Sequence, residues 1–355
     1  MKKTLAVAAL LAAFAGSAAA DVTVYGSLDA GLMWQHADGA DTVQMKHSMN
    51  ETSKFAFKGS EKISDDLTVG FKMEYAIAAD TGLESEKQTA FQRETLLYVK
   101  TAYGELGLGR TGSIGASTGS YAFLGSGNTG FGGGMGPVGD NGFIFLGKNS
   151  RLNNSLTYKS PAMGGVTVFA QLGSDGVDGT EYTHDVANYY GVGAQYAAGA
   201  FKAGLVATVT DQSQADLIEK VEGADDALAV SGFATYDFGA AKLMVAAQYF
   251  DGAKAAYNKD DATKTTAGLE GFGMSVAVSA PVAGGTAKAL VGYADAEELV
   301  TGEKQERMQL AANYVYPLSK TSGLYAAVGY TNVEYKVDST RDEVISGLVG
   351  VYHNF

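Results

Sequence analysis

The chain has 355 residues, with 47 Gly, 20 Tyr and 16 Phe but only 4 Pro and no Cys. The lack of Cys excludes a disulfide framework, a thiolate zinc site and a cysteine nucleophile. The chain has 26 basic and 39 acidic residues, which gives a net charge of −13. This negative charge also excludes a nucleic-acid partner held through its phosphates.

The N-terminus has the three parts of a secretory signal peptide. Met1-Lys2-Lys3 precedes an apolar run over 4–14, and Ala18-Ala19-Ala20 closes the segment. This pattern predicts cleavage after residue 20 and an exported mature chain over 21–355. Beyond the signal peptide, no predominantly apolar window of about 18 residues lacks charge, so no transmembrane helix is predicted. A soluble exported protein and a membrane β-barrel remain.

Strands are predicted by strict alternation of apolar and polar residues. In the first strand, Val24, Leu28 and Leu32 share one face, while Thr23 and Asp29 share the other. The same alternation or turn signals recur along the mature chain. They predict sixteen strands, at 22–34, 52–62, 66–79, 90–102, 104–110, 149–160, 164–173, 187–197, 201–212, 227–238, 240–251, 264–280, 285–295, 305–317, 323–335 and 343–355.

The connections alternate between short turns, such as 197–200, and long polar loops, such as 213–226. Short turns at one rim and long loops at the other are typical of an outer-membrane barrel, in which an even number of strands closes the sheet. Closure is required because lipid offers no hydrogen bonds to a free strand edge. A soluble β-sandwich is the alternative, but the mature chain shows no linker. We therefore predict an all-β fold, a single antiparallel transmembrane β-barrel over 21–355.

A Gly-rich segment at 111–148 interrupts the pattern, and long loops without regular structure are usually functional or disordered. Residues 115–119 match G-x-S-x-G, the nucleophile elbow, which needs a strand before it, a helix after it and a positioned base. His184 and His353 carry no local signature of such a base, so a serine hydrolase using Ser117 is kept only as an alternative. Residues 142–149 resemble a P-loop but end in Asn149. The acidic residues near 175–181 and 219–226 lack calcium-loop spacing. We predict no catalytic residue, no metal site and no cofactor.

Several motifs follow one another along the mature chain: VTVYGSLDAG at 22–31, FKGSE at 57–61, Gln92-Arg93, YGELGLGR at 103–110, RLNNSLTY at 151–158 and VGVYHNF at 349–355. In this order they resemble the motifs of the general porins of Gram-negative outer membranes, particularly the Neisseria and Burkholderia type. The resemblance covers essentially the whole mature chain.

The resemblance implies a homotrimer of 16-stranded barrels in the outer membrane, in contact with lipid and lipopolysaccharide. It implies that the third long loop, 111–148, folds into each lumen and forms a constriction. In this family the C-terminal Phe, here Phe355, is the signal read by the barrel-assembly machinery.

The resemblance also implies a ladder of basic side chains on the barrel wall, facing acidic groups on the loop. Motif alignment and strand parity assign the basic wall to Lys54, Lys58, Lys72, Arg93 and Arg151. Asp140 is the only acidic residue in 111–148, and Glu74, inward beside Lys72 by parity, is the other acidic candidate. Arg110 shares parity with Leu106 and Leu108, so it either follows a break in the strand or faces a subunit contact, and it is left out. Ser27 stands where many enteric relatives carry a wall lysine.

The expected function is passive diffusion of small hydrophilic solutes and ions. The negative net charge of the chain favours cations in the outer vestibules, whereas the basic residues at the constriction favour anions. Because the narrowest section dominates selectivity, we expect a mild anion preference. The alternatives are an outer-membrane barrel enzyme using Ser117 and a soluble exported binding protein.

Overall fold

The computed structural model describes residues 22–83, 90–131, 135, 138–147, 151–174, 181–182, 187–211, 226–254, 268–337 and 339–355. The predicted signal peptide at 1–20 lies outside the described residues. Asp175, Asp178, His184 and most of the acidic run at 219–226 lie outside them as well.

Nearly all regular structure is antiparallel strand. The strands are β1 (Thr23–Ala37), β2 (Ala40–His47), β3 (Lys54–Ser64), β4 (Leu67–Ala76), β5 (Glu94–Thr101), β6 (Gly104–Gly112), β7 (Arg151–Lys159), β8 (Val166–Ser174), β9 (Asn188–Ala198), β10 (Phe201–Asp211), β11 (Asp226–Asp237), β12 (Lys242–Lys254), β13 (Gly268–Val282), β14 (Gly285–Glu298), β15 (Lys304–Pro317), β16 (Ser322–Tyr335) and β17 (Arg341–Asn354). A one-turn helix α2 (Ser126–Thr129) and a 3-10 turn η2 (Asn141–Phe143) lie between β6 and β7. Within the described ranges, no helix is long and apolar enough to cross a membrane.

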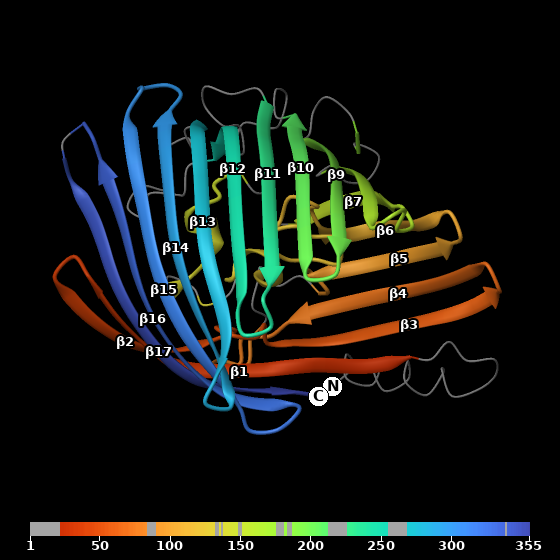
Figure 1. Cartoon of the computed structure of the whole chain (residues 1–355), viewed down its shortest axis with the longest axis horizontal. Helices are drawn as coiled ribbons and strands as arrows, with labels where there is room; N and C mark the ends of the chain where they lie inside the picture. Colours follow the sequence, from red (N-terminus) through yellow and green to blue (C-terminus); the bar gives the residue numbers. More distant parts are fainter. Residues whose placement is uncertain are drawn as a thin grey trace.

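The sheet closes on itself because β1 pairs with β17 on one side and with β2 and β3 on the other. β2 pairs with the part of β1 at 30–37, and β3 pairs with the part at 23–27. β2 and β3 thus form one interrupted strand, and the ring has sixteen positions, as predicted. Figure 1 shows β9–β14 running down the picture and β3–β6 running almost horizontally on the right, with the segment between β6 and β7 lying inside the curved sheet.

β2 was not predicted from the sequence, although one signal for it exists. Asp38 and Gly39 join β1 to β2, with φ values of 52° and 74°. Asp-Gly is the residue pair that favours a two-residue hairpin turn with positive φ at both positions. Only Val43 and Met45 mark the outer face of β2, where they are 70% and 58% exposed. That short apolar pattern was too weak to indicate a strand.

The two faces of the barrel are reversed relative to a soluble protein. On β13, Met274 and Val276 are 49% and 47% exposed, whereas Ser275 between them is only 4% exposed. Gln309 on β15 is fully buried between the exposed Met308 and Leu310. An outward apolar band with polar residues inside is the pattern of a membrane barrel and not of a β-sandwich.

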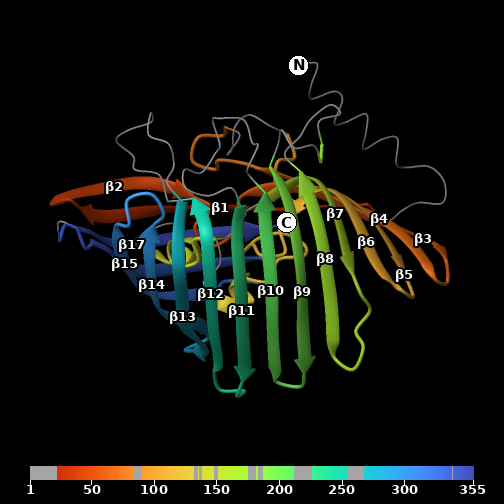
Figure 2. The same cartoon turned by 90° about the horizontal axis from the view of Figure 1, so that it is seen from above.

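The two rims differ as the sequence predicted. Figure 2 shows the tight turns that join β9 to β10 and β11 to β12 at one edge. Exposed aromatic side chains gather near this rim, and Tyr236 and Phe238 pack with ring centroids 4.6 Å apart. Aromatic belts of this kind mark the boundary between membrane and water.

Candidate functional site

One part of the inner face carries a dense group of ionic side chains, which we call the charged wall. It consists of Lys54 and Lys58 on β3, Lys72 and Glu74 on β4, Arg93 just before β5, and Glu94 on β5. The strand register brings these positions together, because Lys58 lies opposite Lys72 and Glu74 opposite Glu94. Four of the five predicted basic residues are therefore neighbours on one wall.

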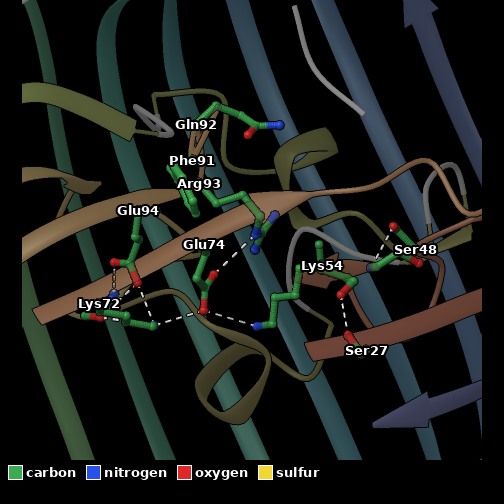
Figure 3. Close-up of polar contacts among 12 residues, drawn as sticks. Ser27, Ser48, Lys54, Lys72, Glu74, Phe91, Gln92, Arg93 and Glu94 are labelled. Carbon is green, nitrogen blue, oxygen red and sulfur yellow. Dashed lines mark hydrogen bonds and ion pairs between the residues drawn. The ribbon is translucent and has the colours of Figure 1, made fainter. Parts of the chain in front are cut away.

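Glu74 lies at the centre of this wall and contacts three cations (Figure 3). Its carboxylate lies 3.3 Å from Lys54 Nζ, 3.1 Å from Lys72 Nζ and 3.3 Å from Arg93 Nε. Tyr25 Oη also donates a hydrogen bond to it, at 2.9 Å. A buried carboxylate is tolerated only when it is paired in this way. The structure thus places Glu74 among the basic residues and not across the lumen from them.

Glu94, which the sequence analysis missed, joins the wall to the segment that follows β6. It accepts hydrogen bonds from Lys72 Nζ at 2.6 Å and Thr111 Oγ1 at 2.6 Å. Ser120 donates to it twice, from its backbone N at 2.8 Å and from Oγ at 3.0 Å. The available signal was parity, since Glu94 and Leu96 alternate with the outward Thr95 and Leu97.

The other basic residues surround this group. Lys58 Nζ lies 5.1 Å from the centre of the Tyr25 ring. Arg151 begins β7 opposite Gly112 and is partly exposed. Arg110 lies at a register shift between β6 and β7, where it donates to the Gln92 carbonyl at 2.6 Å and to Asn153 Oδ1. The break in the strand foreseen for Arg110 is therefore present.

The described residues between 113 and 147, here called the inner loop, pack against the inner face of β8 and β10–β16, which we call the loop-covered wall. Phe123 stacks edge-on against Phe169 and Phe233, with ring centroids 5.0 and 6.4 Å apart. Farther along, a Cβ on Gly329 of β16 would collide with the backbone of Val138. Glycine at this position permits the loop backbone to approach the strand closely. The inner loop is held largely by apolar packing.

Three lysines of the loop-covered wall also hold the inner loop, and the sequence analysis did not select them. Lys242 Nζ donates to the Gly127 carbonyl at 2.6 Å, and Lys288 Nζ donates to the Gly130 carbonyl at 3.4 Å. Lys202 Nζ donates to Asn128 Oδ1 at 3.2 Å. All three contacts are made to α2 or its flanks. Inward parity could have indicated these lysines, but their loop partners could not be inferred from local sequence.

Asp140 lies at the other end of the inner loop. Its side chain accepts a hydrogen bond from the backbone N of Gly142 at 2.8 Å, at the start of η2. Its carbonyl accepts one from Gln309 Nε2 on β15 at 3.2 Å. Asp140 therefore lies against β15, away from the charged wall.

Tyr121 holds the inner loop at the short-turn side, because its Oη donates to Glu105 at 2.8 Å. Burial and the neighbouring Glu105 carboxylate raise the pKa of Tyr121. The hydroxyl consequently remains a donor at neutral pH.

Phe355 extends the pairing between the first strand, β1, and the last strand, β17. Its backbone N donates to the Gly26 carbonyl at 3.1 Å, and its carbonyl accepts from the Gly26 N at 3.0 Å. Its side chain is 52% exposed. The last residue of the chain is thus fixed by its backbone while its side chain stays accessible.

Comparison with known proteins was made on sequence and on fold. A family model described as Gram-negative porin matches residues 6–335. An outer membrane porin protein of Bordetella pertussis is 25% identical over 400 aligned residues, which cover 100% of both chains. Outer membrane porin protein 32 of Delftia acidovorans is 27% identical over 345 residues, covering 93% of this chain and 89% of its own.

Solved structures give the same architecture. An anion-selective porin from Comamonas acidovorans superposes with a TM-score of 0.70 at 22% identity, covering 95% of this chain and 100% of its own. OmpF of Salmonella typhi, solved with daunomycin, gives a TM-score of 0.67 at 16% identity, covering 95% of this chain and 98% of its own. At these identities the likeness extends to the fold alone.

Proposed function

The chain belongs to the Gram-negative porin family and forms a diffusion channel in the outer membrane, and we propose that this channel passes small hydrophilic solutes and ions with a mild preference for anions. Family membership identifies a channel and not an enzyme, and it gives no support to a hydrolase built on Ser117.

The charge balance of the charged wall carries the proposed anion preference. Four basic side chains (Lys54, Lys58, Lys72 and Arg93) share this wall with two carboxylates (Glu74 and Glu94). Arg151, on the strand that follows the inner loop, is proposed to extend the basic side. Charges lining a narrow passage with low-dielectric walls bias local ion concentrations. The related porin from Comamonas acidovorans is named as anion-selective, which agrees with this proposal.

The segment 111–148 is proposed to form the constriction. Its described part packs against the loop-covered wall through two apolar clusters, and Glu94 ties its beginning to the charged wall. Permeating ions would then pass between the inner loop and the charged wall. Asp140, the only acidic residue of this segment, is proposed to supply a weak acidic contribution from the side of β15.

We further propose a homotrimer that contacts lipid and lipopolysaccharide and is assembled through recognition of Phe355. The exposed Phe355 side chain at the end of β17 supports accessibility to an assembly factor. A trimer predicts a heat-labile oligomer in detergent and channel closure in thirds at high voltage. Replacing Phe355 with Ala is expected to lower the yield of assembled oligomer in the outer membrane.

The selectivity is tested by reconstituting the purified mature chain in planar bilayers and measuring the reversal potential across a KCl gradient. The wild type is expected to prefer chloride. Arg93→Gln and Lys54→Gln are each expected to move the reversal potential toward cations, and the shift should shrink as salt rises. Lys320→Gln, in the short turn before β16, removes the same charge at the rim and serves as the control. Cation preference in the wild type would overturn the proposal, and unchanged Arg93 and Lys54 variants would overturn the wall assignment.

A further inference from the structure

A second segment, residues 48–53 between β2 and β3, also turns toward the inside of the barrel. It is held by Asp29 of β1, whose fully buried carboxylate accepts hydrogen bonds from three consecutive backbone N–H groups. The distances are 3.3 Å to Met49 N, 2.9 Å to Asn50 N and 2.7 Å to Glu51 N. Tyr325 Oη of β16 donates to the same carboxylate at 2.6 Å. A charge-assisted network of this kind fixes the segment in one conformation.

The 48–53 segment meets the inner loop directly. The backbone N of Met135 donates to the Met49 carbonyl at 2.5 Å. The Met49 side chain is 6% exposed and belongs to the same apolar cluster as Phe131 and Met135. Two segments from distant parts of the sequence therefore join each other on the inner side of the barrel.

Glu51 is the charged residue of this segment, and its side chain is exposed to solvent. It lies three residues before Lys54 of β3, and Met49 of the same segment shares an apolar cluster with Leu290, which lies on the same face of β14 as Lys288. Around the ring, β14 is separated from β3 by β15, β16, β17 and β1. The 48–53 segment therefore connects parts of the wall that are not neighbours in the sheet.

Glu51 and Lys288 thus extend the charged wall into a row of alternating charges, Lys288, Glu51, Lys54, Glu74, Lys72 and Glu94, of which the last four are joined by ion pairs. Glu74 and Glu94 are each only a few per cent exposed and are closely paired, whereas Glu51 is open to water. Asp140 lies against β15 and caps its own turn. Among the described acids of this row, Glu51 is the one that a permeating ion can approach.

We propose that Glu51 and Lys288 set the charge selectivity of the channel together with the charged wall, an inference that rests on the proposed diffusion function and deepens it. The 48–53 segment is then a second constricting segment. Glu51 supplies the main acidic group of the narrow section, beside the weaker contribution of Asp140, and Lys288 supplies a further basic group. Anions pass near Lys288 and Lys54 and are repelled by Glu51 between them.

Single-charge variants measured in a KCl gradient at low salt test this proposal. Glu51→Gln is expected to raise the chloride-to-potassium permeability ratio by about twofold or more, because two lysines then face the lumen without the acid between them. The backbone N of Glu51 makes the contact to Asp29, so this substitution leaves the segment anchored. Lys288→Gln is expected to lower the ratio, and Lys288→Arg, which keeps the charge and a donor for Gly130, should leave it near the wild-type value. The double variant should fall between the two single variants.

Asp140→Asn is the matched control, since it removes one carboxylate from the inner loop. A shift in Asp140→Asn as large as that in Glu51→Gln would overturn the inference, because net charge alone would then explain both. Unchanged ratios for Glu51→Gln and Lys288→Gln, with a shift in Arg93→Gln, would overturn the inference and leave the charged wall intact. Unchanged ratios in all variants, Arg93→Gln included, would instead overturn the wall assignment of the proposed function. Heat-modifiable mobility of each variant confirms that the barrel has folded.

Discussion

The charged wall and the loop-covered wall belong to one barrel and follow the same alternation of residues, yet their lysines serve different partners. On the charged wall, Lys54 and Lys72 pair with carboxylates. On the loop-covered wall, Lys202, Lys242 and Lys288 donate to a side-chain amide and to backbone carbonyls of the inner loop. Inward parity therefore identifies lumen residues but does not show which of them pair with carboxylates and which donate to the inner loop.

The largest effect is expected from breaking the apolar packing of the loop-covered wall. Phe123 is fully buried against Phe169 and Phe233. Phe123→Ala is expected to cost about 3–5 kcal/mol in the free energy of unfolding, because the cavity cannot be filled by rearrangement of strands. Urea unfolding in lipid vesicles measures the loss, and single-channel recordings should show larger or noisier steps. Phe238→Ala, which removes an exposed aromatic at the rim, is the control. Unchanged single-channel conductance and current noise in the Phe123 variant would contradict a role for this packing in holding the loop.

A smaller effect is expected at Glu94, which joins the charged wall to the inner loop. Glu94→Gln removes the charge that binds Lys72 and weakens the contacts from Thr111 and Ser120. The expected loss is about 1–3 kcal/mol, since buried donors are left poorly satisfied. The same variant should raise chloride preference, because Lys72 loses one of its two carboxylates. The free energy of unfolding and the reversal potential should therefore both change. A change in only one of them would show that Glu94 either holds the inner loop or affects ion selectivity, but does not do both.

The smallest effect is expected at Lys242, which lies close to the solvent-exposed Gly127. Lys242→Met should cost less than about 1 kcal/mol in unfolding, as for other solvated charged contacts. The wall comparison predicts a smaller shift of reversal potential than for Lys54→Gln, measured in the same gradient. A shift as large as that of Lys54→Gln would show that the lysines of the two walls act alike on ions.

The barrel could be predicted from the sequence because its pattern is local. Alternation of apolar and polar residues located every strand except β2 to within a few residues, and the sixteen positions around the ring were confirmed. What escaped prediction depends on contacts between distant positions. Asp29 looked like an ordinary inward residue of β1, and only the folded chain shows that it holds 49–51 and contacts Tyr325. Strand parity placed Glu74 inward beside Lys72, but it could not show how many cations would surround it.

The seam between β1 and β17 has a consequence for how the protein is made. Its register joins Ser27 to Asn354 and Ala37 to Val344, so residues from the first and last strands must meet before the sheet closes. Until that pairing forms, two strand edges remain open, and open edges template aggregation with other chains. Contacts between such distant residues also form slowly. We therefore expect closure of the seam to be a late step in folding, during which the open edges must be kept away from other copies of the chain.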